Sequence, residues 1–332
     1  MSKLANVGIE DVPEVVNEMA GYREWVDPLL DGVMADNSQS ERKRVRVAIA
    51  SLPATDEHVN WLTDRLVSEQ LPPHEFLVIR DSLLPHADGI AEVLRRKLTE
   101  ESLLPRQRLR VAAALAAYDN SPELWNPIAG EVAGRILREP ATDATVWIEA
   151  MRPVADYIDR ELSEQFDSVE TLEAARIGAM ALYRLDADHV RAIAARLPSS
   201  NGPRYRAIVE LLKRDADALP AVRQQLQQLS APGDSEFDAE AQAAMLANVI
   251  LALYELGDAE PFLTYSQLAA DPRVRTRLLH GATPDRIDLA VLMPLIRDTS
   301  PCDARAVALT AAYGHLDEPM PQSVRDELHA IL

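Results

Sequence analysis

Apolar residues recur at the spacing of an α-helix along almost the whole chain. Ile90, Val93 and Leu94 fall at positions i, i+3 and i+4, and the segments 190–197 and 222–229 keep a similar spacing. Residues at these intervals lie on one face of an α-helix. The alternation of apolar and polar residues that is typical of a β-strand occurs nowhere over a useful length. The pattern therefore predicts an all-α protein.

Proline and glycine mark the expected helix ends. A capping side chain followed by proline is typical of a helix start, because the first helical residue needs no N–H. This rule predicts helix starts at Asn126-Pro127, Asp271-Pro272, Thr283-Pro284 and Ser300-Pro301. Gly257 follows an apolar run and is expected to end that helix in the left-handed conformation. Pro294 falls inside another predicted helix, which it should kink.

One arginine-rich pattern occurs more than once. The stretch RQRLRVAAALAAYD at 106–119 closely matches RKRVRVAIASLP at 42–53. Arg110 follows Arg46 by 64 positions, and Arg176 follows Arg110 by 66. An interval of roughly 65 residues is the length of two helical hairpins, so about ten to twelve helices are expected. The predicted fold is an all-α, HEAT-like α-solenoid of irregular helical hairpins.

The 106–119 stretch also predicts how such hairpins pack. Its alanines allow close approach of neighbouring helices, and Val111 and Leu115 share one apolar face. Arg108 and Arg110 stand near the helix start, where a guanidinium can reach a carboxylate or the loop carbonyls of an adjacent hairpin. The alternative is that these arginines are solvated and bind nothing.

Turn-forming residues divide the chain into two parts. SAPGDSEFD at 230–238 is rich in such residues and is the predicted loop or boundary. Residues 1–230 are then an N-terminal helical-repeat array, and residues 239–332 are C-terminal HEAT-like repeats continuous with it through the 230–238 loop. A shorter break is expected at LPSSNGPR, residues 197–204.

Charge and cysteine content limit the classes of function. The chain has 53 acidic and 34 basic residues, a net charge of -19. Such a surface repels nucleic acid and anionic lipid, so neither is an expected partner. Cys302 is the only cysteine, which excludes an intramolecular disulfide. The first residues lack the apolar core of a signal peptide, and a cytoplasmic location is expected.

The sequence offers little chemistry. Twelve glycines form no phosphate-binding loop, and the seven histidines show no metal-binding spacing. Cys302 lacks an evident base, so a passive cysteine is favoured over a nucleophile. We therefore predict a protein that is not an enzyme, with no catalytic, cofactor-binding or metal residue and no cofactor.

Four residues are candidates for interaction. Tyr22 and Trp25, in GYREWVDPLL, can act as aromatic anchors for a protein partner. Arg108 and Arg110 are the other two, as groups that could bind an anionic ligand. The interpretation favoured for every tryptophan, Trp25 included, is packing in the core or between helices: Trp25, Trp61, Trp125 and Trp147.

Several stretches together resemble a known family. They are YREWVDPLL, RVAIASLPATDEHVNWLTDRL, EFLVIRDSLLPHADGIAEVLRRKL, RQRLRVAAALAAYD, WIEAMRPV and DPRVRTRLLHGATPDRIDLAVLMPLI. From about residue 20 onward the chain looks like the α-helical, HEAT-like repeat region of planctomycete multidomain proteins. In that family the region lies between a serine/threonine protein kinase domain and a domain resembling the formylglycine-generating, sulfatase-modifying enzymes. No kinase motif occurs in this sequence, so phosphotransfer is not implied. The resemblance leaves open whether the chain is an excised module or a stand-alone relative.

Three functions follow from these observations. The leading hypothesis is a non-enzymatic interaction scaffold or regulatory spacer that docks a protein partner through its concave face or its 230–238 loop. The expected partner is a serine/threonine kinase or a formylglycine-generating-enzyme-like domain. The second is a regulatory module that binds a ligand or phosphopeptide in a groove through Arg108 and Arg110. A HEAT-like nucleic-acid enzyme, similar to alkylpurine DNA glycosylases, is opposed by the net charge. Arginines paired within the protein would favour the scaffold, and an unpaired cluster would favour the ligand-binding module. The oligomeric state is not predicted.

Overall fold

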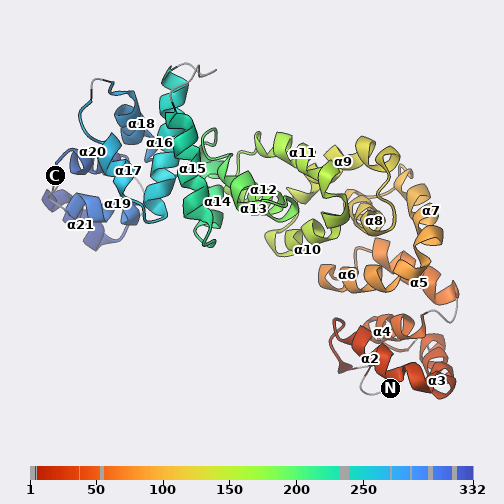
Figure 1. The fold of residues 1–332 in the computed structure, drawn as a ribbon. Coiled ribbons are helices and arrows are strands. Elements are labelled where there is room, and N and C mark those ends of the chain that lie inside the picture. The colour runs from red at the N-terminus through yellow and green to blue at the C-terminus, as the bar shows by residue number, and fades with distance from the viewer. Residues whose placement is uncertain are drawn as a thin grey trace. The chain divides into compact units, whose positions relative to one another are not determined.

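A computed structural model describes most of the chain (Figure 1). The described residues are 4, 6–36, 38–52, 56–231, 239–269, 271–284, 286–297, 302–315 and 320–331. They form α-helices and short 3₁₀ helices joined by turns, and none of them lies in a β-strand. The all-α prediction is thus confirmed for this part of the chain. None of the described helices has both the length and the apolar composition needed to cross a membrane.

The chain forms two compact units, residues 1–161 and 162–332. Unit 1 contains α2 (Val12–Met19), η1 (Ala20–Tyr22), α3 (Arg23–Ala35), α4 (Glu41–Ser51), α5 (Asp56–Val67), α6 (Pro73–Ser82), η2 (Leu84–His86), α7 (Ala87–Leu98), α8 (Pro105–Tyr118), α9 (Pro122–Ile136), α10 (Ala141–Met151) and η3 (Arg152–Val154). The division falls within α11 (Ala155–Phe166).

Helix α8 is the centre of unit 1. It packs against α5, α7, α9 and α10. Every residue from Leu109 to Ala116 is buried, including four alanines that are at most 2% exposed. The sequence predicted a helix with one apolar face, but α8 is covered on all sides. Its small side chains permit this, because they let several neighbouring helix backbones approach closely.

Unit 2 continues with α12 (Leu172–Leu185), α13 (His189–Ala194), α14 (Gly202–Leu212), α15 (Ala218–Ser230), α16 (Ala239–Glu255), α17 (Glu260–Tyr265), α18 (Arg273–Gly281), α19 (Leu289–Arg297), α20 (Cys302–Tyr313) and α21 (Gln322–Ile331). Helices that are two apart in chain order contact each other: α12 packs on α14, α14 on α16, α16 on α18 and α18 on α20. Helix α16 is buried from Leu246 to Leu253. Helix α16 is therefore the most continuously buried helix of unit 2, as α8 is in unit 1.

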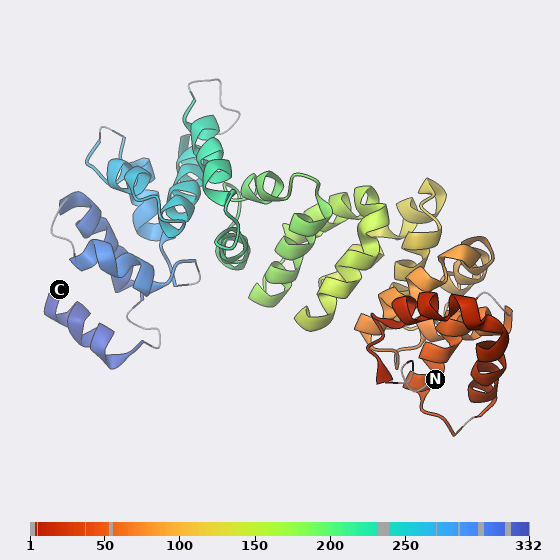
Figure 2. The same cartoon turned by 60° about the horizontal axis from the view of Figure 1, so that its bottom comes forward.

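The unit boundary differs from the one expected at 230–238. Residues 232–238 lie outside the described part of the chain. The helices on either side of that segment, α15 and α16, pack directly against each other within unit 2 (Figures 1 and 2). The structure instead separates Glu161 from Leu162. The turn-forming composition at 230–238 thus identified the segment that connects two neighbouring helices. The end of a unit is determined instead by the contacts between helices.

Several predicted helix ends can be compared with the structure. Gly257 has a φ of +94°, and the N–H of Asp258 donates to the carbonyl of Leu253 at 2.9 Å. This is the hydrogen bond of a glycine-terminated helix, and the prediction for Gly257 is confirmed. The start predicted at Pro127 is wrong, since α9 begins at Pro122 and runs through Pro127. Its apolar contacts with the rest of unit 1 continue on both sides of this proline.

Helix α19 likewise runs through its internal proline. It extends from Leu289 to Arg297 with Pro294 inside. Leu292, Met293, Leu295 and Ile296 are buried around it. Burial of these side chains holds the segment helical although proline removes one backbone donor.

Candidate functional site

The first half of α3 carries an exposed apolar surface. Tyr22, Trp25 and Leu29 are 61%, 68% and 57% exposed. The ring centroids of Tyr22 and Trp25 lie 6.4 Å apart, with the ring planes tilted by 40°. Tyr22 is the last residue of η1, directly before α3, and its ring lies beside that of Trp25. The spacing of four residues places Trp25 and Leu29 on one side of α3. We call these three residues the aromatic face.

The opposite side of α3 explains why this face points outward. Helix α3 packs against α4, and Leu30 is fully buried. The Arg23 guanidinium donates to the carbonyl oxygen of Ala50 in α4 and forms an ion pair with Asp27 at 3.0 Å. These contacts set the rotation of the helix about its axis. With Leu30 turned inward, the aromatic face is left exposed by the residues of unit 1 that the structure describes.

The surroundings of the aromatic face are strongly acidic. The segment 10–36 has eight acidic residues and one basic residue, Arg23. Glu24 and Asp31, which also lie in α3, are exposed. Single exposed apolar residues are ordinary, whereas several large exposed apolar side chains on one short segment are typical of a docking site. The charge here favours a partner with basic side chains.

Arg108 is engaged within unit 1. Its Nη1 atom donates to the carbonyl of Leu98 at 2.8 Å, and its Nη2 atom donates to that of Glu100 at 3.3 Å. Its Nε atom lies 3.3 Å from Oε1 of Glu131. The expectation that this arginine reaches loop carbonyls and a carboxylate is confirmed. Its donors thus bind groups of the protein itself.

Arg110 lies in the interior and is only 5% exposed. Its Nη2 atom donates to the carbonyl of Leu71, and its guanidinium carbon lies 5.2 Å from the ring centroid of Trp147. Burial lowers the pKa of this guanidinium, although an arginine stays protonated at neutral pH. The structure does not bring Arg110 to the aromatic face: α3 packs on α4, whereas α8 packs on α10 and its other neighbours.

The repeated arginine pattern has one structural meaning at two of its three positions. Arg46, 1% exposed, donates to the carbonyl of Val7 at 3.0 Å. Its acceptor precedes it by 39 residues, the same separation that joins Arg110 to Leu71. Arg176 differs, because it is half exposed and forms a bidentate ion pair with Glu210. In unit 1 the arginine of this pattern is buried and donates to a distant backbone carbonyl, whereas in unit 2 it forms an ion pair at the surface.

The other tryptophans pack within unit 1, as predicted. Trp125 is fully buried and its Nε1–H donates to the carbonyl of Asp119 at 2.7 Å. Trp147 is 3% exposed and makes an edge contact with Phe76. The half-buried ring of Trp61 lies between the guanidinium groups of Arg44 and Arg65. Trp25 is the one tryptophan with a largely exposed side chain, so the packing interpretation is wrong for this residue, because α3 turns Leu30 rather than Trp25 toward α4.

The side chains that could bind a metal ion are dispersed in the described ranges. No three His, Cys, Asp or Glu side chains come together there in a way that could hold a metal ion. The side chain of Cys302 lies outside the part of the chain that the structure describes, so its interpretation as a passive cysteine stays a prediction.

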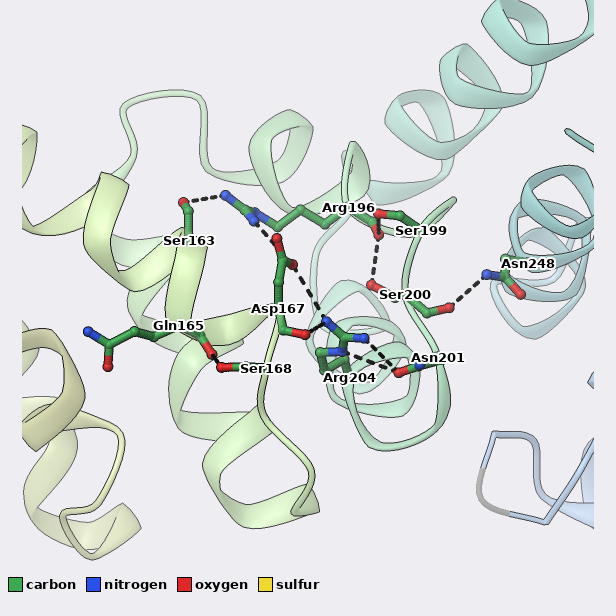
Figure 3. A network of polar contacts seen from close by, with 10 residues as sticks. All are labelled: Ser163, Gln165, Asp167, Ser168, Arg196, Ser199, Ser200, Asn201, Arg204 and Asn248. Atoms are coloured by element: carbon green, nitrogen blue, oxygen red, sulfur yellow. Dashed lines mark hydrogen bonds and ion pairs between the residues drawn. The ribbon is translucent and has the colours of Figure 1, made fainter. Parts of the chain in front are cut away.

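A polar network in unit 2, which the sequence did not predict, connects the end of α11 with the loop before α14 and with α16 (Figure 3). The Arg204 guanidinium joins the carbonyl oxygen of Asp167 to Oδ1 of Asn201, and Arg196 donates to Ser163. Asn248 donates to the carbonyl oxygen of Ser200 at 2.7 Å. The signal for this last contact was present in AMLANVILALYEL, because a lone asparagine inside a buried apolar helix requires hydrogen-bond partners.

Comparison with protein families, with curated proteins and with solved structures finds no significant match to this chain.

Proposed function

We propose that the protein is a non-enzymatic interaction scaffold or regulatory spacer that docks a partner protein through the aromatic face. The observation that carries this proposal is the joint exposure of Tyr22, Trp25 and Leu29 at the end of η1 and in the first half of α3. Aromatic side chains supply much of the binding energy of protein interfaces once they are buried. Leaving three large apolar groups in water is unfavourable for an isolated protein, and a partner that covers them removes this cost.

A HEAT-like architecture of stacked helical hairpins is part of the proposal. It is supported by the packing of every second helix in unit 2 from α12 to α20. It is also supported by the equal separation between Arg46 or Arg110 and the carbonyl that each binds. Stacked repeats place equivalent contacts at similar intervals, as these are.

The partner is proposed from chemistry and from the family resemblance. An apolar surface in the acidic segment 10–36 is complementary to a partner that has apolar and basic side chains together. We propose a serine/threonine kinase or a formylglycine-generating-enzyme-like domain as that partner. A cytoplasmic location belongs to the same proposal, because a single cysteine permits no intramolecular disulfide.

The contacts of Arg108 and Arg110 favour the scaffold over a ligand site formed by these two residues. Arg108 binds Glu131 and two carbonyls, and Arg110 is buried beside Trp147. An anion would have to displace the contacts of Arg108, and it could reach Arg110 only by entering the interior, where that residue is 5% exposed. The net charge of -19 continues to oppose a nucleic-acid enzyme.

The test compares proteins captured from a lysate of the source organism by three forms of the chain. The forms are the unchanged protein, the double variant Tyr22→Ser and Trp25→Ser, and the control variant Tyr313→Ser, which alters another exposed aromatic residue. Mass spectrometry quantifies each captured protein. We expect a partner retained by the unchanged chain and the control but reduced at least about thirtyfold by the double variant, as for loss of a hot spot worth about 2 kcal/mol. If the double variant retains every captured protein as well as the control does, the aromatic face is not a docking site.

A further inference from the structure

Unit 2 contains a pocket of about 650 Å³ between the loop before α14, helix α16 and the end of α18. Ser200 and Asn201 line it from the loop, Ala244 and Met245 from α16, and His280 from α18. Arg286, which follows α18, completes the wall. This volume lies within the roughly 300–1,000 Å³ of typical small-molecule sites.

Arg286 has two partners within unit 2. Its Nη1 atom donates to Oδ1 of Asn248 at 2.8 Å, and its guanidinium lies over the ring of Tyr205, 5.6 Å from the centroid. Both partners are neutral. No carboxylate among the described residues forms an ion pair with it, whereas Arg223 pairs with Asp258 at 2.7 Å. The positive charge of Arg286 is therefore available to a ligand.

Asn248 fixes the position of that charge. Its Nδ2 atom donates to the carbonyls of Ser200 at 2.7 Å and Pro198 at 2.9 Å (Figure 3 shows the bond to Ser200). Because the amide hydrogens are taken by these carbonyls, the amide oxygen is the atom that faces Arg286. Asn248 is only 6% exposed. The guanidinium is thus held in place before any ligand arrives, which lowers the entropic cost of binding.

The remaining walls determine the kind of ligand. Ala244, Ala247 and Met245 provide an apolar side along α16. Arg277 also lines the pocket, but it is ion-paired with Glu240. One uncompensated guanidinium beside an apolar wall suits a molecule that combines a single anionic group with an apolar body. Long-range repulsion by the acidic chain is weak here, because salt screens charges beyond about 8 Å at physiological ionic strength.

We propose that this pocket binds a small organic anion, a carboxylate or a phosphate monoester with an apolar body. The anionic group binds the Arg286 guanidinium, and the apolar body lies against Ala244 and Met245. His280, at the exposed rim, offers a further nitrogen to the anion. The aromatic face takes no part in this pocket. The test of ligand binding to the pocket is therefore independent of the test of the scaffold proposal.

The test uses the full chain and three probes of similar size, namely phenyl phosphate, benzoate and neutral benzyl alcohol. Ligand-observed NMR titration measures the Kd of each. We expect at least one of the two anions to bind, and benzyl alcohol to bind at least about tenfold more weakly, since a hydrogen bond to a charged group contributes at least that factor. Arg286→Gln should weaken binding of the anion by about tenfold or more. Arg297→Gln, which removes an exposed arginine paired with Glu327, is the matched control and should leave the Kd unchanged.

Ala244→Leu provides a second variant that fills the pocket and leaves Arg286 in place. It should also weaken binding at least about tenfold, because the added methyl groups occupy space that the ligand needs. Circular dichroism verifies that each variant is folded. The proposal is overturned if neither anion binds at millimolar concentration, if benzyl alcohol binds as tightly as the anions, or if folded Ala244→Leu binds them like the unchanged chain.

Discussion

Replacing Asn248 by leucine is expected to destabilise unit 2 substantially. Leucine has nearly the shape of asparagine, so the exchange removes hydrogen bonds and leaves little change in volume. The lost contacts are those from Nδ2 to the carbonyls of Pro198 and Ser200, at 2.9 and 2.7 Å, and the one that Oδ1 accepts from Arg286 at 2.8 Å. These groups connect α16 to the loop before α14 and to the segment after α18.

The magnitude follows from these contacts. Two neutral hydrogen bonds contribute about 1 kcal/mol each, and the bond from the charged guanidinium contributes about 2 kcal/mol. The apolar surface that leucine adds offsets about 1 kcal/mol of this loss. The free energy of unfolding of unit 2 should therefore fall by about 3 kcal/mol, which lowers Tm by about 9 °C for a unit of this size.

Calorimetry of the full chain measures the change in Tm, and hydrogen exchange identifies where it acts. Amides of the 197–205 segment should exchange faster in Asn248→Leu, because the loop loses its attachment to α16. Gln242→Leu is the matched control on the same helix. The half-buried side chain of Gln242 makes one hydrogen bond, to the carbonyl of Leu229 at 2.8 Å. Loss of this single bond should lower the free energy of unfolding by less than about 1 kcal/mol. Equal Tm values for the two variants would refute the reasoning.

Two further predictions concern unit 1. Arg110→Lys should lower the free energy of unfolding by about 1–3 kcal/mol, because an ammonium group cannot both stack on the indole of Trp147 and reach the carbonyl of Leu71. A urea titration measures this change, and an unchanged urea midpoint would contradict the prediction. Hydrogen bonds from Ser38 and Gln39 lower the pKa of Asp36 from 3.8 to about 2. The resulting stabilisation is complete above pH 3.8 and is lost as the pH falls toward about 2. NMR titration should show this pKa, and Ser38→Ala together with Gln39→Ala should return it toward 3.8; a carboxyl that titrates near 3.8 in the unchanged chain would show that these bonds are not formed.

The aromatic face shows what could be foreseen of the candidate site. Tyr22 and Trp25 were identified from their residue types, and Leu29 could have been added from its spacing of four residues after Trp25. The exposure of Trp25 could not be foreseen, because Trp125 occurs in a similar local context and is fully buried. Burial depends on which helix packs on which, and neighbouring sequence does not report that.

The amino-acid sequence by itself determined the helices and some of their ends. Helical periodicity is a local property, and the left-handed conformation at Gly257 follows from the lack of a side chain there. The sequence also indicated that Arg108 and Arg110 can reach a carboxylate or loop carbonyls, with solvated side chains as the alternative, and both arginines bind carbonyls in the structure.

Only the tertiary structure decided which of these residues are inside. Arg110 is buried while its counterpart Arg176 is at the surface, although the local patterns are alike. Helices α8 and α16 are covered on all sides, and Arg286 meets Asn248 from 38 residues away. These outcomes depend on contacts between distant segments. Such contacts are set by the simultaneous packing of several helices, which no single stretch of sequence encodes.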